Sequence, residues 1–347
     1  MLFQEDRIPM ATDNAPLITV IIPVHNELTI HQVLEFLLKL KYPRDKLELI
    51  MVDDSTTNEI SQIIKRFISQ SVSQFCYIKW IKLPQRVGVS HARNIGIENA
   101  SGDYVLLLDS DVVLTENALL ELLQTLRNHE ECGAVSAIYI HDAPSIIEKI
   151  TLRRYIGRIK EGPLFTGASL IPKHVIEKVG SFNEKLGYPY TVYEDWEYQV
   201  RIEKLGLRTL VNGKVVLQHL HKVGMQQKSQ NPLNNILTLL ASYFSFRKAF
   251  ALHEVLKHAP WRLRLEYIFH SLLVLATLVL FPINYILIFF LWLVVLTLTV
   301  CYYAIEMRGN ILHASQYSIA TLIARTTRAF TLTIYLMYRC IKAFHRN

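Results

Sequence analysis

The sequence predicts an α/β fold in which a mostly parallel sheet is flanked by helices and is followed by a helical C-terminal part. Apolar, β-branched segments alternate with amphipathic segments across residues 17–138, as in parallel strands joined by helical crossovers. The apolar run 104–108 is followed by two aspartates, Asp109 and Asp111, and ligands bind at the carboxyl ends of such strands. In the C-terminal part, residues 267–305 contain no Asp, Glu, Lys or Arg.

The elements of the first half follow from local signals. An apolar strand ends at Pro23, and apolar residues at helical spacing follow it. Gly102 separates a short helix from the central strand. We expect strands at 17–22, 47–52, 75–81, 104–108 and 134–138, and helices at 30–38, 60–68, 93–99 and 114–127. This alternation predicts a Rossmann-like sheet.

Beyond residue 139 the pattern becomes less regular. Segment 145–160 is basic and partly amphipathic, and segment 162–170 contains Gly-Pro and Thr-Gly turns. A helix is expected at 191–205, and one or two strands are expected within 208–216. This half is less typical of nucleotide binding, and we expect it to serve an acceptor.

The apolar stretch 267–305 is expected to enter a membrane. As a single helix it would be roughly 58 Å long, about twice the ~30 Å hydrocarbon core of a bilayer. Pro282 offers a break in that helix. The sequence therefore predicts a transmembrane hairpin at 263–305, with arms 263–281 and 283–305. The first arm is marginal in length, and a re-entrant segment is the alternative for it.

Charges predict the orientation of this hairpin. Basic residues flank both arms and no acidic residue follows Glu306, so the positive-inside rule predicts cytoplasmic flanks and a multi-pass membrane protein. The first residues lack the apolar core of a signal peptide, so the main domain is expected in the cytoplasm. The expected organisation is an N-terminal extension (1–15), the main domain (16–225), an interfacial helical linker (226–262), the hairpin (263–305) and a basic, partly interfacial cytoplasmic tail (306–347).

The tail leaves one alternative open. A third span around 317–338 is possible, but Arg325 and Arg328 fall on one helical face. That spacing favours a helix that lies in the membrane interface.

Composition restricts the class of partner. The net charge is +7, from 37 Lys and Arg against 30 Asp and Glu, yet no nucleic-acid motif is present. Attraction to anionic lipid headgroups explains the excess more simply, and no nucleic-acid partner is expected. The four cysteines form no C-x-x-C pair, which predicts reduced thiols.

Paired carboxylates follow two of the predicted strands. Asp109 and Asp111 supply oxygen ligands that suit Mg²⁺ or Mn²⁺, which in turn bind a diphosphate. The alternative is a strand followed by an N-capping aspartate. Asp53 and Asp54 end the strand beside Pro23, where a carboxylate can accept the N–H of a nucleobase. We expect one of the two to bind the nucleotide, and either Asp53 or Asp54 fits. In the alternative interpretation, one of them caps the following helix.

Several motifs occur in one order along residues 16–221. They are Pro23-Val-His-Asn26-Glu27, Asp53-Asp54-Ser55, Gly88-Val-Ser-His-Ala-Arg93-Asn94, Asp109-Ser-Asp111 and Glu194-Asp195-Trp196-Glu197. Each is weak alone. Together they resemble glycosyltransferase family 2, which comprises inverting enzymes with a GT-A fold.

The resemblance implies roles for individual residues. It assigns general-base catalysis to Asp195. It assigns the binding of a divalent metal, Mn²⁺ or Mg²⁺, to Asp111, Asp109 and His219. The residues to which it assigns nucleotide-sugar binding are Pro23, Asn26, Glu27, Asp53, Asp54, Arg93 and Asp109. Arg93 either contacts the phosphates or sugar, or forms a salt bridge to a site carboxylate. Glu27 and Asp195 have helix capping as their alternative, and His219 has a structural role as its alternative.

The implied function is metal-dependent, inverting transfer of a single sugar from a nucleotide-sugar donor. The acceptor is a hydroxyl of a lipid-linked saccharide or glycan at the cytoplasmic membrane face, and a UDP-sugar is expected ahead of a GDP-sugar. A Q-x-x-R-W motif, typical of processive polysaccharide synthases, is absent from the sequence. The alternatives are a polyprenyl-phosphate glycosyltransferase, whose phosphate acceptor needs no base, and a non-catalytic membrane scaffold, which needs none of the carboxylates.

Overall fold

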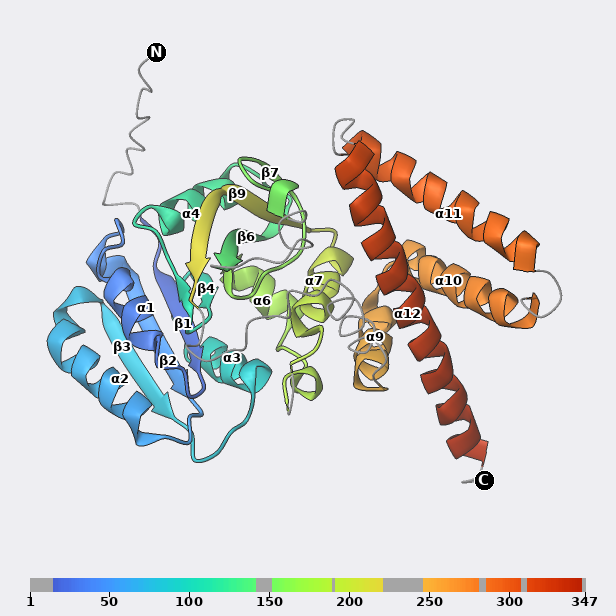
Figure 1. Ribbon diagram of the computed structural model, residues 1–347. Coiled ribbons are helices and arrows are strands. Elements are labelled where there is room, and N and C mark those ends of the chain that lie inside the picture. The colour runs from blue at the N-terminus through green and yellow to red at the C-terminus, as the bar shows by residue number, and fades with distance from the viewer. Residues whose placement is uncertain are drawn as a thin grey trace, which may run out of the picture. The chain divides into compact units, whose positions relative to one another are not determined.

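The chain divides into two compact units, which we describe separately (Figure 1). The computed structural model describes residues 15–141, 152–188, 191–220, 246–280, 285–306 and 311–344. Unit 1 consists of Met1–Asp142, Gly157–Pro189 and Leu207–Lys222, and unit 2 consists of Ala143–Ile156, Tyr190–Gly206 and Val223–Asn347.

Unit 1 is built on one mixed sheet with the strand order β3-β2-β1-β4-β8-β6-β9-β5, in which β7 also pairs with β9. The strands are β1 (Ile18–Val24), β2 (Leu47–Asp53), β3 (Tyr77–Lys82), β4 (Tyr104–Leu108), β5 (Val112–Val113), β6 (Cys132–His141), β7 (Ile159–Glu161), β8 (Ala168–Pro172) and β9 (Arg208–His219). Strands β1, β2, β3 and β4 pair in parallel, as the alternation of segments predicts.

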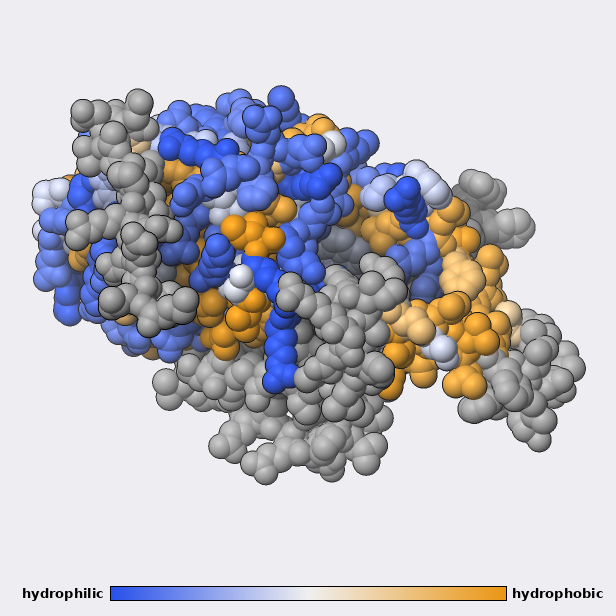
Figure 2. Space-filling view, turned by 90° about the horizontal axis from the view of Figure 1, so that it is seen from above, coloured by the Kyte–Doolittle hydropathy of each residue, from blue (hydrophilic) through white to orange (hydrophobic). Residues whose placement is uncertain are grey.

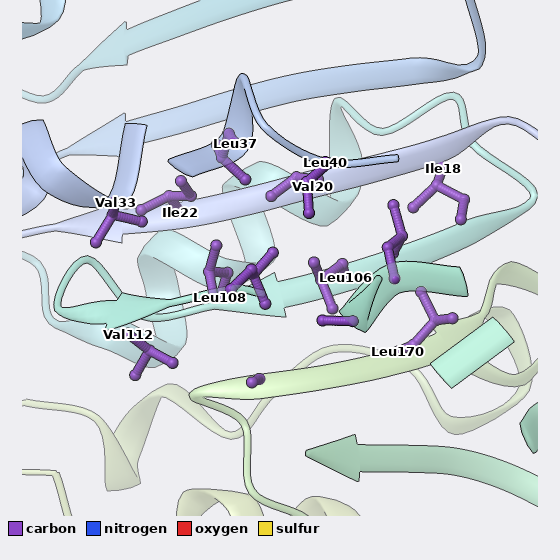
Figure 3. Close-up of a cluster of buried hydrophobic side chains, with 14 of the residues drawn as sticks. Ile18, Val20, Ile22, Val33, Leu37, Leu40, Leu106, Leu108, Val112 and Leu170 are labelled. Carbon is purple, nitrogen blue, oxygen red and sulfur yellow. The ribbon is translucent and has the colours of Figure 1, made fainter. Parts of the chain in front are cut away.

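Helices cover both faces of this sheet. They are α1 (Ile30–Leu37), α2 (Asn58–Ser71), α3 (Val89–Glu98), α4 (Ala118–Arg127) and α6 (Lys173–Val179), with short 3-10 turns η2 (Arg44–Lys46), η3 (Val72–Gln74) and η4 (Glu184–Leu186). Side chains alternate along β1: Ile18, Val20 and Ile22 join the main core together with residues of α1 (Figure 3). The same core includes residues of α2 and α4. Ile21 faces α3, where it closely approaches Gly96.

The sheet differs from the prediction in its second half. Strand β8 pairs antiparallel with both β4 and β6, and so separates them. Its sequence, Ala-Ser-Leu-Ile-Pro, lies beside the turn signals of 162–170, and those signals concealed a five-residue buried strand. The second half also forms one long strand, β9, where one or two shorter strands were expected.

Unit 2 is helical. It contains α7 (Glu194–Lys204), α9 (Phe246–His258), α10 (Trp261–Leu280), α11 (Tyr285–Glu306) and α12 (Ile311–Phe344). Its core joins Leu252 of α9, Tyr267 of α10, and Ala329 and Leu332 of α12. Large apolar side chains such as Leu272 and Leu298 stay exposed on these helices, and Figure 2 shows apolar surface there.

The predicted multi-pass membrane topology is contradicted. Among the described residues, no helix combines the length and the apolar character that a membrane span requires. The expected arms correspond to α10 and α11, and both of these helices pack against α12. The predicted break at Pro282 lies outside the described residues, as do the extension 1–14 and residues 226–245 of the linker. The apolar composition of 267–305 therefore led to a wrong localisation.

Candidate active site

Asp109 and Asp111 follow the carboxyl end of β4, where the sequence placed a site. The side chain of Asp109 is 32% exposed and that of Asp111 is 25% exposed. Both carboxylates are therefore accessible, although the strand before them is buried. A turn bond from the Val112 N–H to the Asp109 carbonyl, with a length of 3.2 Å, folds the chain back directly after the strand.

Asp111 and His219 are brought together by the pairing of β5 with β9. Val112 lies opposite His219 in this antiparallel pair. The His219 Nε2 lies 3.7 Å from the Asp111 Oδ1. The Leu220 N–H donates a 2.7 Å hydrogen bond to the Asp111 carbonyl, which fixes the backbone on both sides of the pair.

Asp109 is held from the opposite direction by Arg93 of α3. The Arg93 Nη2 lies 2.9 Å from the Asp109 Oδ1, and its side chain is 3% exposed. Its guanidinium also stacks on Phe182, 5.7 Å from the ring centroid. Of the two interpretations of Arg93, the structure contains the salt bridge to a site carboxylate. A buried guanidinium that holds Asp109 still leaves that carboxylate half-buried and accessible.

Gly167 and Tyr139 complete this side of the site. A Cβ at Gly167 would lie 2.9 Å from the Asp109 Oδ2 and 3.1 Å from a ring carbon of Tyr139, closer than such contacts normally are. The Asp109 N–H donates a 3.0 Å hydrogen bond to the Gly167 carbonyl. The Tyr139 ring lies 5.4 Å from the His219 ring, so this tyrosine lies between Gly167 and His219.

Asp53 is fully buried at the end of β2. Its Oδ1 accepts hydrogen bonds from the Ser55 N–H, at 2.9 Å, and from the Lys82 Nζ, at 3.2 Å. Its Oδ2 accepts from the Trp80 Nε1 at 3.3 Å. These bonds tie β2 to β3, because Asp53 and Lys82 are partners in the parallel register.

Asp54 is also buried, and it organises the loop before α3. Its Oδ2 accepts hydrogen bonds from the N–H groups of Val87, at 2.9 Å, and Gly88, at 3.0 Å. Its Oδ1 lies 2.9 Å from the Nδ1 of His25, which follows β1. Neither aspartate is the N-cap of α2, which is Thr57.

The segment after β1 is locked to the same loop. The Asn26 Oδ1 accepts a 2.9 Å hydrogen bond from the Thr56 N–H, and the Asn26 Nδ2 donates a 3.0 Å hydrogen bond to the Thr56 hydroxyl. Asn26 has a left-handed backbone with φ 50°. The Glu27 Oε1 accepts a 2.9 Å hydrogen bond from the hydroxyl of Thr29, which is itself the N-cap of α1. Pro23 is buried within β1, opposite Val52 of β2.

Asp195 belongs to unit 2. It is half-buried in the first turn of α7, and its Oδ1 accepts a 2.8 Å hydrogen bond from the N–H of Trp196. The neighbouring Glu194 is buried. A helix N-terminus favours the ionised carboxylate, which is the form that a base requires.

Sequence reasoning missed three partners of these carboxylates: His25, Trp80 and Lys82. One signal was present for His25, because it lies inside the motif Pro23-Val-His-Asn26-Glu27. The others reach their carboxylates only through strand pairing, and a register between separate strands is not encoded in any local pattern.

The donor set around Asp111 fits a divalent metal held jointly with a diphosphate. Within the described part of the chain, no group of three His, Cys, Asp or Glu side chains converges as a metal cage. Mg²⁺ and similar ions often take only one or two protein carboxylates together with substrate phosphates. Asp111, with His219 beside it and Asp109 two residues before it, meets that requirement.

Comparisons with known proteins find similar sequences. "Probable glycosyltransferase YdaM" of Bacillus subtilis is 30% identical over 222 residues, which are 58% of this chain and 51% of that protein. "Poly-beta-1,6-N-acetyl-D-glucosamine synthase" of Staphylococcus aureus is 30% identical over 156 residues, 44% of this chain and 36% of that protein. The chain thus spans about half, or less, of the length of these curated relatives.

A solved structure shows the same fold. The mannosyltransferase PcManGT from Pyrobaculum calidifontis, in complex with GDP-Man and Mn²⁺, superposes with a TM-score of 0.53 at 20% identity, covering 92% of this chain and 88% of that one. The predicted α/β fold of GT-A type is therefore confirmed for the sheet and its helices. The family described as "Glycosyl transferase family 2" matches residues 19–181, which include the motifs from Asn26 to Asp111. Residues 19–181 are therefore similar to glycosyl transferase family 2, and these similarities support a glycosyltransferase.

Proposed function

We propose that this protein is a metal-dependent, inverting glycosyltransferase that adds one sugar from a nucleotide-sugar donor to a hydroxyl of a lipid-linked or glycan acceptor. The observation that carries the proposal is the pairing of Asp111 with His219 at 3.7 Å, beside the accessible carboxylate of Asp109. These accessible carboxylates lie at the carboxyl end of the central strand, where ligands of open α/β sheets bind.

The proposed donor site divides the carboxylates by exposure. Asp109 and Asp111 would face the diphosphate and ribose. Asp111, Asp109 and His219 would hold a divalent metal, which when bound would supply charge neutralisation to the leaving group. Asp53 and Asp54 shape the nucleotide-binding loops from inside, since both are buried and hydrogen-bonded. Pro23, Asn26 and Glu27 border the same loops, and Arg93 orients Asp109.

Asp195 is the proposed general base. An acceptor hydroxyl attacks the anomeric carbon from the face opposite the nucleotide, and the Asp195 carboxylate takes the hydroxyl proton as the bond forms. This single displacement inverts the anomeric configuration. The expectation of a hydroxyl acceptor rests on this residue, because an ionised phosphate acceptor would need no base.

The test compares wild type with Asp195→Asn and with a control on the same helix. Glu203→Gln is that control, since Glu203 lies in the last turn of α7 and accepts a 2.7 Å hydrogen bond from Gln199. Transfer and donor hydrolysis are measured with UDP-, GDP- and dTDP-sugars in the presence of Mn²⁺ or EDTA, and the anomer of the product is assigned by NMR.

We expect an inverted anomer, dependence on the metal, and loss of transfer only in Asp195→Asn. A retained anomer would contradict the mechanism. Full activity of Asp195→Asn on a phosphate-bearing acceptor would replace the hydroxyl acceptor with a phosphate acceptor. Absence of nucleotide binding by folded protein would favour the non-catalytic alternative.

A further inference from the structure

The helix that carries Asp195 begins in an unusual way. Its N-cap is Tyr193, whose backbone is left-handed at φ 59° and ψ 20°, and no side-chain hydrogen bond caps the helix. Bulky residues rarely adopt this conformation, which persists only where surrounding structure fixes it. The start of α7 must therefore be held by tertiary contacts.

Those contacts come from an aromatic cluster closed by Arg328. The rings of Tyr193 and Trp196 meet edge to face, with centroids 5.6 Å apart at 89°. The Arg328 guanidinium of α12 lies 5.4 Å from the Tyr193 centroid and 6.0 Å from the Trp196 centroid. Arg328 thus contacts the residue on each side of the pair Glu194-Asp195.

Tyr267 of α10 packs against the Trp196 ring of this cluster. Its ring lies 6.4 Å from Trp196, and its side chain is buried. Burial raises the pKa of the Tyr267 hydroxyl, and the charge and hydrogen bond of Arg328 counteract part of that rise. Arg328 therefore joins α12 both to α10 and to the start of α7.

The connection to Asp195 runs through the backbone of Trp196. The Asp195 Oδ1 accepts its 2.8 Å hydrogen bond from the Trp196 N–H, so the position of Trp196 sets the orientation of the carboxylate. A misplacement of about 1 Å at a catalytic group can cost ~100-fold in rate.

We propose that Arg328 is a positioning residue that orients the Asp195 carboxylate through Tyr193 and Trp196. This inference rests on the proposed function, in which Asp195 is the base. It also gives the C-terminal helices a role in catalysis, since Arg328 lies on α12. The planar guanidinium is required for stacking on two rings, and a lysine ammonium does not reproduce it.

The test variant is Arg328→Lys, and its control is Arg325→Lys. Arg325 lies one turn earlier on α12 and pairs with Glu266 at 2.6 Å. We expect Arg328→Lys to lower the transfer kcat by ~10- to 100-fold, with the donor KM within about twofold of wild type. Arg325→Lys should leave both parameters near wild type. Tyr267→Phe, which removes only the hydroxyl, should give a smaller loss of kcat and covers the case in which Arg328→Lys folds poorly.

The double variant with Asp195→Asn separates the two proposals. If Arg328 acts through Asp195, adding Arg328→Lys to Asp195→Asn causes no further loss of transfer. A further loss, or equal kcat in Arg328→Lys and Arg325→Lys, overturns the inference and leaves the proposed function intact. Full transfer by Asp195→Asn alone overturns the general base itself.

Discussion

His219 and Asp111 lie on paired strands whose register holds the imidazole Nε2 3.7 Å from the carboxylate Oδ1. These residues are 108 positions apart in the sequence, as their numbers show, and only the fold joins them. A neutral imidazole and a carboxylate are common ligands for divalent transition metals. We therefore predict a separate effect on metal-dependent nucleotide binding for the substitution of each residue.

Asp111→Asn is expected to abolish Mn²⁺-dependent nucleotide binding, because it removes the charged ligand. His219→Gln should weaken that binding by at least about tenfold, or ~1.4 kcal/mol. Titration calorimetry of UDP and GDP, with Mn²⁺ and with EDTA, measures both effects.

Asp103→Asn is the control for this pair of variants. Asp103 directly precedes β4, so it lies at the opposite end of this strand from Asp109 and Asp111. The Asp103 Oδ2 accepts a 3.0 Å hydrogen bond from the Leu17 N–H. Equal metal dependence in all three variants would contradict the proposed metal site.

Gly167→Ala should disturb the site without removing any of its ligands. The new Cβ would lie 2.9 Å from the Asp109 Oδ2 and 3.1 Å from Tyr139, so one of these side chains must move. Overpacking of this kind costs ~1–3 kcal/mol of folding stability. We expect a lower affinity for the nucleotide together with a small loss of stability, measured by titration and by denaturant unfolding. An unchanged nucleotide affinity would show that the position of Asp109 is not critical.

Much of the fold could be predicted because buried parallel strands are apolar on both faces. The structure places β1, β2, β3 and β4 within two residues of the expected limits. Strand β8 could not be predicted, since it is short, contains Ser169 and ends in Pro172. Antiparallel insertion beside β4 is a tertiary event that no local pattern encodes.

The candidate site was predictable in its carboxylates but not in their environments. A D-D or D-x-D pair is visible in the sequence, whereas the burial of Asp53 depends on its register opposite Lys82 of β3. The same limit applies to Arg328, whose spacing from Arg325 indicated a membrane interface. In the structure, Arg325 pairs with Glu266, and Arg328 lies over the rings of Tyr193 and Trp196.

Gly88→Ala should destabilise the protein more than Gly180→Ala, although both glycines have a left-handed backbone, with φ 86° and 81°. The two positions differ in the space around them. A Cβ at Gly88 would lie 2.5 Å from the Gly187 carbonyl oxygen, whereas nothing lies within 4 Å of a Cβ at Gly180. With ψ of 161° and −168°, both positions lie in a region that essentially only glycine adopts, so the backbone cost alone is ~1–3 kcal/mol, and only Gly88→Ala adds a backbone clash to it.

Denaturant unfolding of the two variants measures this difference in the free energy of unfolding. Gly88→Ala should also weaken nucleotide binding, because the Gly88 N–H donates to Asp54 in the loop before α3. Equal destabilisation by both substitutions would mean that the loops 86–88 and 187–188 separate without cost.

Glu184 of η4 links the segment 182–186 to α3, and its ionisation makes stability depend on pH. It lies 2.8 Å from the Nδ1 of His91 and accepts a 2.9 Å hydrogen bond from Asn94. Burial opposes ionisation, but the hydrogen bonds from Asn94 and His91 and the charge of His91 prevail, and they lower the pKa of Glu184 below its ordinary value of 4.5. The ionised form is therefore stabilised in the folded protein.

A lowered folded pKa fixes the sign of this effect. The contribution of Glu184 is complete above pH 4.5 and is lost as the pH falls through the lower folded pKa. Glu184→Gln should therefore be less stable than wild type near neutral pH, and the two should converge in acid. Because the side chain is 49% exposed, the difference should stay below ~1 kcal/mol. Denaturant unfolding across this pH range, with exposed Glu177→Gln of α6 as the control, measures it. A difference that persists unchanged in acid would show that Glu184 acts through packing and not through its charge.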